Sequence, residues 1–204
     1  MEAVGAVILA AGGSTRLGQP KQLLRHQSES LIRRAALAAL AAGCLPTVIV
    51  TGKEHEQIAN ELTGLHVRVR HHPHWERGIG SSIRAGVEEA LALQPALNAL
   101  LIMVCDQPFV SADLLVALIS ARAKAGTKAA ACTYADTIGV PALFDRVLFS
   151  ALAGLSDQQG AKALLSAMDW EIARVEFPAG AIDIDTPADS RAHLDGSAAL
   201  STGT

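Results

Sequence analysis

The chain has 204 residues, of which 50% are hydrophobic and only 3% are aromatic, so we expect one domain with a large aliphatic core. The formal net charge of −3 argues against a broad nucleic-acid surface, and no apolar run reaches the roughly 18 residues of a membrane span. The chain lacks a basic leader, and its three cysteines lack metal-ligand spacing, which predicts reduced thiols in a cytoplasmic protein.

The first two-thirds of the sequence alternate between strand-like and helix-like patterns. Strands are predicted at residues 4–10, 47–51, 66–70, 99–104 and 129–133. Helices are predicted at residues 30–42, 54–62, 81–93 and 111–125, and Gly43 is well placed to end the first. This alternation predicts an α/β fold, a three-layer sandwich around a Rossmann-like, mainly parallel, doubly wound sheet.

The pattern changes in the last third. Helices are predicted at residues 145–153 and 159–168, short strands at 172–177 and 181–184, and a last short helix beginning at Pro187. Residues 139–157 are interpreted as a substrate-side insertion. With no linker to divide the chain, residues 1–195 are expected to form a single domain and residues 196–204 a C-terminal tail.

A loop of small polar residues follows the first predicted strand. Gly12 and Gly13 would let backbone N–H groups approach an anion, and Arg16 and Lys21 could neutralise a polyphosphate. Neither the P-loop pattern nor the dinucleotide-binding glycine pattern is complete in this chain. The segment therefore predicts a phosphate-binding loop of another kind, although both cations could also be solvated loop residues.

Five segments together carry a family resemblance over nearly the whole chain. Residues 9–21 read L-A-A-G-x-S-x-R-x-G-x-P-K and residues 75–86 read W-x-x-G-x-x-x-S-x-x-x-G. Residues 105–108, 139–144 and 183–189 read C-D-Q-P, G-x-P-x-x-F and D-I-D-T-P-x-D. The chain thus resembles the MobA-like nucleotidyltransferases, and among them the molybdenum cofactor cytidylyltransferases. The resemblance implies the nucleotide-diphospho-sugar transferase (GT-A-like) fold and Mg²⁺-dependent transfer of CMP from CTP to the phosphate of molybdopterin, with release of pyrophosphate.

The same resemblance implies the site residues. Arg16, Lys21 and Asp106 are expected to be catalytic. The residues expected to bind the nucleotide are Leu9, Ala10, Ala11, Gly12, Gly13, Ser14, Arg16, Lys21, Gly80, Ser81, Ser82 and Asp106. On the residues alone, Ser81 or Ser82 could instead cap the helix that follows.

Two aspartates are the candidate magnesium ligands. Asp106 follows the predicted strand 99–104, and Asp185 follows a shorter one, so both could reach the carboxyl edge of the sheet. Mg²⁺ binds through one or two carboxylates together with phosphate oxygens and water, and the resemblance carries both residues over as metal ligands. A turn aspartate and a helix N-cap are the structural alternatives. The histidine run 71–74 has no partner at ligand spacing and is expected to be solvated or to pack in its loop.

The base and the acceptor are less defined by the sequence. Ala11 stands where guanylyl-transferring relatives have the first glycine of their L-A-G-G loop, which favours cytidine by a margin of about 1–3 kcal/mol. Residues 156–161 read S-D-Q-Q-G-A where the family has G-D-x-G-A, and Arg146 and Lys162 are nearby cations. The expected partners are CTP or another nucleoside triphosphate and molybdopterin or another phosphorylated small molecule. A transferase acting on a sugar phosphate, and a non-catalytic carrier serving a molybdoenzyme client, are the alternatives.

Overall fold

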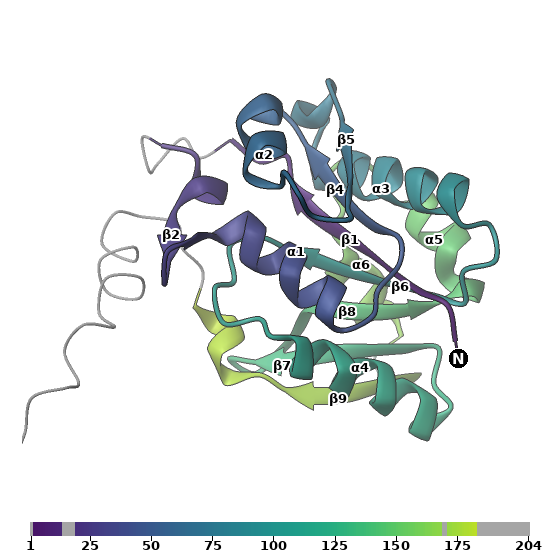
Figure 1. Ribbon diagram of the computed structural model, residues 1–204. Helices are drawn as coiled ribbons and strands as arrows, with labels where there is room; N and C mark the ends of the chain where they lie inside the picture. The colour runs from purple at the N-terminus through teal and green to yellow at the C-terminus, as the bar shows by residue number, and fades with distance from the viewer. Residues whose placement is uncertain (1, 14–18, 169–170, 183–204) are drawn as a thin grey trace, which may run out of the picture.

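The computed structural model describes residues 2–13, 19–168 and 171–182. These residues form a seven-stranded sheet of order β5-β4-β1-β6-β8-β7-β9, with β1 near its centre (Figure 1). The strands are β1 (Val4–Ala10), β4 (Thr47–Thr51), β5 (Arg68–His71), β6 (Ala99–Val104), β7 (Ala129–Tyr134), β8 (Thr137–Asp145) and β9 (Ile172–Glu176). The predicted tail at 196–204 and the predicted helix at Pro187 lie outside the described residues.

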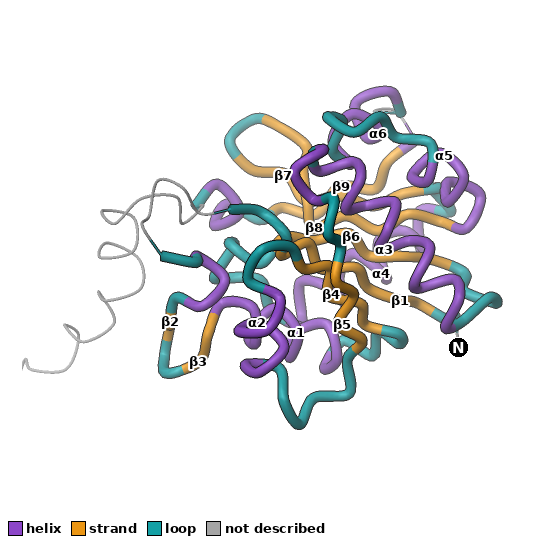
Figure 2. The backbone as a smooth tube through the Cα atoms, turned by 90° about the horizontal axis from the view of Figure 1, so that it is seen from above, coloured by secondary structure: helices purple, strands orange, loops and turns teal. Residues whose placement is uncertain are grey.

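Helices cover both faces of this sheet, as the view from above in Figure 2 shows. One face carries α1 (Leu31–Ala41), α2 (His55–Glu61) and α4 (Ala112–Ala125), and the other carries α3 (Ile79–Leu93), α5 (Phe149–Ala153) and α6 (Ala161–Ala167). A two-stranded hairpin, β2 (Arg25–His26) and β3 (Glu29–Ser30), precedes α1. The predicted three-layer α/β sandwich is therefore confirmed.

The core lies where the pattern of apolar strands places it. Leu9, Ile49 and Ile102 are buried in three adjacent strands, because β1 pairs in parallel with β4 on one side and with β6 on the other. The three cysteines are buried free thiols, and burial raises the pKa of Cys44 to about 12. Within the described residues, no helix has both the length and the apolar character that crossing a bilayer requires.

The structure predicted for one segment is wrong, because that segment is a strand of the central sheet. Residues 137–145, which the sequence placed largely in a substrate-side insertion, form β8, an antiparallel strand inserted between β6 and β7. The tight turn that joins β7 to β8 places Ala135 and Asp136 at φ of 46° and 55°, without glycine or asparagine to mark it. The β7–β8 register also shifts between Ala131 and Cys132, opposite Pro141. Proline has no backbone N–H to donate to a neighbouring strand, so its presence makes this strand difficult to predict from the sequence.

Two local predictions are also wrong. The strand predicted at 181–184 is not formed in its described part, because a 3₁₀ helix occupies Pro178–Ala181. Neither Ser81 nor Ser82 caps α3, which begins two residues earlier with Gly78 as its N-cap. Gly43 does end α1, at a φ of 79° that favours glycine.

The close contact between α3 and the sheet gives a stability prediction. An alanine in a helix is normally about 1 kcal/mol more favourable than a glycine. A Cβ atom on Gly86, however, would lie 2.3 Å from Val7 Cγ1 and 3.0 Å from Val50 Cγ2, both in buried, stiff side chains. We expect Gly86→Ala to lower the free energy of unfolding by about 1–3 kcal/mol in urea titrations. The exposed Glu88→Ala on the same helix is the control, and a stabilised Gly86→Ala protein would contradict the packing.

Candidate nucleotide site

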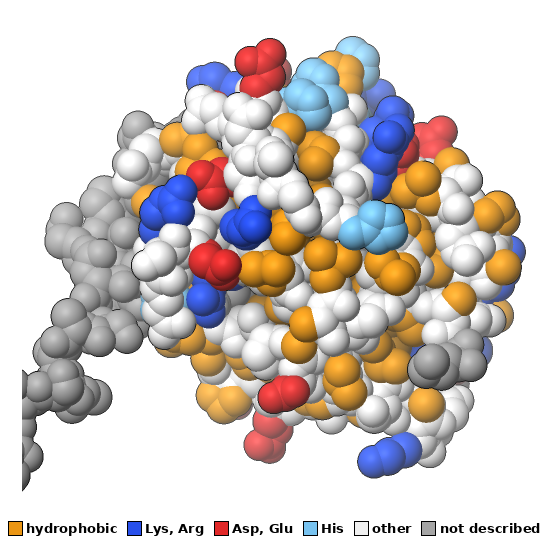
Figure 3. Space-filling model, viewed as in Figure 1, with side chains coloured by type: hydrophobic (Ala, Val, Ile, Leu, Met, Phe, Trp, Pro, Cys, Tyr) orange, Lys and Arg blue, Asp and Glu red, His pale blue; other side chains and the backbone are white. Residues whose placement is uncertain are grey.

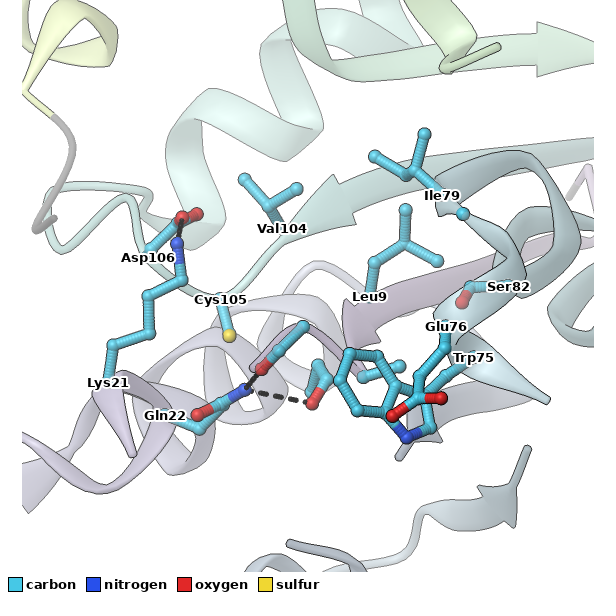
Figure 4. Close-up of a pocket in the computed structure, with 14 residues that line it drawn as sticks. Leu9, Lys21, Gln22, Trp75, Glu76, Ile79, Ser82, Val104, Cys105 and Asp106 are labelled. Atoms are coloured by element: carbon cyan, nitrogen blue, oxygen red, sulfur yellow. Dashed lines mark hydrogen bonds and ion pairs between the residues drawn. The ribbon is translucent and has the colours of Figure 1, made fainter. Parts of the chain in front are cut away.

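A cavity of about 330 Å³ opens where β1 and β6 end (Figure 4). Its walls come from the loops after these two strands, from the 3₁₀ helices η1 (Lys21–Leu23) and η2 (Trp75–Arg77), and from the start of α3. The lining residues are Leu9, Ala10, Ala11, Gly12, Lys21, Gln22, Trp75, Glu76, Gly78, Ile79, Ser82, Val104, Cys105 and Asp106. The cavity therefore lies at the sheet edge where open parallel sheets bind ligands.

The structure brings many of the predicted nucleotide-binding residues to this cavity. The seven that line it are Leu9, Ala10, Ala11, Gly12, Lys21, Ser82 and Asp106. Gly13, Gly80 and Ser81 lie just beyond its lining: Gly13 is against Trp75, and Ser81 is buried with its hydroxyl donating to Gly78 O at 2.7 Å. Ser14, Arg16 and Asp185 lie outside the described residues.

The cavity's charged centre is an ion pair between residues far apart in the sequence. Lys21, at the start of η1, places its Nζ on Oδ2 of Asp106, just beyond β6. The other carboxylate oxygen, Oδ1, is buried, and no donor from the described part of the chain reaches it. One oxygen of Asp106 thus already accepts a cation, and the second retains its capacity to accept another.

Gln22 is a lining residue that the sequence analysis missed. Its buried side-chain Nε2 donates to the carbonyl oxygens of Ala10 at 3.0 Å and Gly12 at 2.7 Å (Figure 4). The two bonds tie η1 to the end of β1 and so join the two ends of the glycine-rich loop. A polar residue directly after the motif lysine and before two leucines was the available signal.

Trp75 forms the opposite wall by packing on a glycine. A Cβ atom on Gly52 would lie 2.6 Å from Trp75 Cγ and 2.5 Å from Ala11 O, so only glycine leaves room for the indole. Trp75 therefore both packs against Gly52 and lines the cavity. Gly52 follows β4, and nothing in the local sequence distinguishes it from an ordinary turn glycine.

The histidine loop supports the site through one hydrogen bond. Because Ser81 Oγ donates to Gly78 O, its 3.0 Å contact with His72 Nε2 requires the ring nitrogen to be the donor. Burial lowers the pKa of His72, and the nearby positive charges of His74, Arg70, Arg77 and Arg84 lower it further. Within the described residues, no three His, Cys, Asp or Glu side chains lie close enough together to hold a metal ion.

The cations considered for the acceptor do not lie at the cavity. Arg146 donates to the carbonyl oxygens of Pro95 at 2.7 Å and Leu97 at 2.8 Å, at the opposite edge of the sheet, where β6 begins. Lys162 is exposed on the first turn of α6. On the face shown in Figure 3, acidic and basic side chains are interspersed and form no continuous basic patch over the described surface.

Sequence comparison finds the same family over most of the chain. The model of the MobA-like NTP transferase domain matches residues 6–173. Nicotine blue oxidoreductase from Paenarthrobacter nicotinovorans is 30% identical over 174 residues, which cover 82% of this chain and 83% of that protein. Molybdenum cofactor cytidylyltransferase from Escherichia coli (strain K12) is 31% identical over 91 residues, which cover 43% of this chain and 45% of that protein.

Solved structures agree with the sequence comparison. Rv0371c from Mycobacterium tuberculosis H37Rv superposes with a TM-score of 0.77 at 27% identity, over 96% of this chain and 99% of that chain. Its complex with manganese gives a TM-score of 0.75 at 26% identity, over 95% and 99%. A nucleotidyl transferase from Methanothermobacter shares the fold with a TM-score of 0.78 at 23% identity, over 95% and 96%. The chain belongs to the MobA-like NTP transferase family, whose fold is that of the nucleotidyltransferases.

Proposed function

We propose that the protein is a Mg²⁺-dependent cytidylyltransferase that transfers CMP from CTP to the terminal phosphate of molybdopterin. The observation that carries this proposal is the meeting of Lys21 and Asp106 beside a glycine-rich loop at the mouth of the cavity. Nucleotidyl transfer needs a bound triphosphate, neutralised charge and a stabilised leaving group, and these residues suit those tasks. The partial match to a molybdenum cofactor cytidylyltransferase supports the choice of acceptor.

In the proposed reaction, an oxygen of the acceptor phosphate attacks the α-phosphorus of CTP. A new bond forms between these atoms, the bond from the α-phosphorus to the bridging oxygen breaks, and pyrophosphate leaves with the electron pair. Lys21 exchanges its contact with Asp106 for the triphosphate oxygens and offsets the charge that grows on the leaving group. Arg16, which follows the glycine pair, is assigned the same task. No covalent intermediate with the protein is required.

The residues at the site fit a hard divalent cation. Asp106 presents a buried carboxylate oxygen that lacks a donor within the described residues, and a second carboxylate, Asp185, is proposed to join it. The bound ion would withdraw negative charge from the phosphate oxygens. The manganese complex of Rv0371c, a structural relative, supports a divalent metal in this family.

The floor of the cavity bears on the choice of base. Ala11 lines it and is 5% exposed, and both the Ala11 carbonyl oxygen and the Trp75 ring lie close to Gly52. The extra methyl group takes room that a glycine would leave for a purine. A difference of this size biases the choice by about 1–3 kcal/mol, so we propose CTP as the preferred nucleotide.

Pyrophosphate release tests the proposal directly. The protein is incubated with Mg²⁺, CTP or GTP, and either molybdopterin or a panel of sugar phosphates. We expect pyrophosphate release with CTP and molybdopterin. Release only with a sugar phosphate would favour the alternative transferase, which the altered sequence of residues 156–161 also suggests. Tight cofactor binding without turnover would indicate a carrier. Because one relative is named an oxidoreductase, consumption of NAD(P)H is followed in parallel.

Lys21 is the first residue to test. We expect Lys21→Ala to lower turnover by about 100- to 1000-fold, because a preorganised charge at the transition state is lost. The free energy of unfolding should change far less, because Lys21 lies in the cavity lining and belongs to neither of the two large hydrophobic clusters that pack the sheet. Lys124→Ala, on the exposed side of α4, is the matched control. Unchanged turnover in Lys21→Ala would remove this lysine from the mechanism.

The two aspartates distinguish metal binding from structural roles. We expect Asp106→Asn and Asp185→Asn each to abolish metal-dependent turnover in a folded protein, because an amide is a poorer ligand for Mg²⁺. The losses should be strongly non-additive in the double variant, since the second change acts on a site already without its metal. Asn caps a helix as well as Asp, so an active Asp185→Asn enzyme would return Asp185 to a capping role.

Gln22 is proposed to position the glycine-rich loop. Gln22→Glu replaces the donor that serves two carbonyl groups with an oxygen, so at pH 8 we expect unfolding free energy to fall by about 2–3 kcal/mol and turnover to fall with it. Burial should raise the pKa of the new carboxyl group, which becomes a donor once protonated. The deficit relative to wild type should therefore shrink as the pH falls towards about 5.

The exposed Gln57→Glu is the control for a carboxylate placed elsewhere. Urea titrations and pyrophosphate release at both pH values give the comparison. A deficit of Gln22→Glu that is the same at both pH values would contradict the assigned hydrogen bonds.

A further inference from the structure

Behind the nucleotide side of the cavity lies a short segment between α5 and α6, residues 155–160, which we call the bracing loop. We propose that its Asp157 is a positioning residue for the bound nucleotide, although the family resemblance points this segment towards the acceptor. The inference deepens the proposed function and rests on it. In this inference, Asp157 influences the affinity for the nucleotide and does not influence the affinity for the acceptor.

The first evidence is direct contact between two backbones. Gly80 N donates to Asp157 O at 2.9 Å. A Cβ atom on Gly80 would lie 2.0 Å from Ser156 O, and one on Gly78 would lie 2.3 Å from Asp157 O. Only glycine at these two positions lets the bracing loop lie against the start of α3, so Gly78 and Gly80 both serve a contact between segments.

The second evidence is the set of polar bonds that fixes this contact. The Asp157 carboxylate accepts from Arg77 Nε at 2.9 Å through Oδ2 and pairs with Arg84 through Oδ1. Arg84 also donates to Leu155 O, and Gln158 Nε2 donates to Arg77 O at 2.7 Å. Hydrogen bonds from Arg84 and then Arg77 hold the pKa of Asp157 below its usual range. The carboxylate therefore remains ionised and paired at neutral pH.

The third evidence is what lies between the two arginines. Gly78, Ile79 and Ser82 are flanked by Arg77 and Arg84 in the sequence, and all three line the cavity. Asp157 thus clamps both ends of the turn that forms the nucleotide wall. Both carboxylate oxygens of Asp157 accept from these arginines, and we infer that Asp157 acts on the nucleotide through this turn.

Asp157→Asn is the decisive variant, since it keeps the shape and removes the charge. We expect the dissociation constant of Mg²⁺·CTP, measured by calorimetry, and the KM for CTP to rise by about threefold or more. The KM for the acceptor should not change. Arg77→Met, at a side chain that is 61% exposed, removes one of the two pairs and should shift the same constants less.

The chain provides a closely matched control on the same helix. Glu89, further along α3, pairs with Arg68 Nε at 2.6 Å and with Arg70 Nε at 3.7 Å, so Glu89→Gln also removes a carboxylate that serves two arginines. It should lower thermal stability to a similar degree and leave the affinity for CTP unchanged. A general loss of stability would move both variants together.

Calorimetry separates this inference from the proposed reaction. A wild-type protein that binds Mg²⁺·CTP but releases no pyrophosphate would refute the reaction and still test Asp157 through the dissociation constant. Unchanged nucleotide affinity in Asp157→Asn, or a rise in the acceptor KM alone, would overturn the inference. A wild-type protein that binds no nucleoside triphosphate would overturn both.

Discussion

The parallel pairing of β1 with β6 is the constraint on which the candidate site depends. The register sets Leu9 beside Val104, so both strands end at one edge and their loops open into one cavity. Lys21 and Asp106 are 85 residues apart, yet this pairing leaves each within reach of the other. Neither strand carries the chemistry itself; their shared direction decides which loop residues meet.

The described part of the candidate site contains few charged residues. Lys21 pairs with Asp106, Glu76 is the other charged lining residue, and the rest of the lining consists mainly of glycine, alanine and larger apolar residues. A bound triphosphate would bring more negative charge than Lys21 alone can balance, which explains why the proposed chemistry also calls on Arg16 and a divalent ion. The overall charge of −3 is consistent with a basic site that is local.

The sequence predicted those features that depend on local patterns. The apolar runs of β1, β4 and β6 identified the core strands, and the motif residues Lys21 and Asp106 meet in the lining of the candidate site. What it missed depends on contacts between distant segments. β8 is recognisable only from its neighbours β6 and β7, and the hydrogen bonds of Gln22 appear only once η1 lies beneath the end of β1. Asp157 is a third case, because its partners lie more than 70 residues away.

The position of Trp75, packed on Gly52 at the cavity wall, has a consequence for its fluorescence. The indole lines the cavity, so a nucleotide entering there would displace water from the indole's surroundings and alter its emission. The chain has two tryptophans, and replacing Trp170 with Phe leaves Trp75 as the single emitter. Trp75 would thus be an intrinsic fluorescent probe of cavity occupancy, with no added label. Its emission would make the kinetics of ligand entry accessible to stopped-flow spectroscopy.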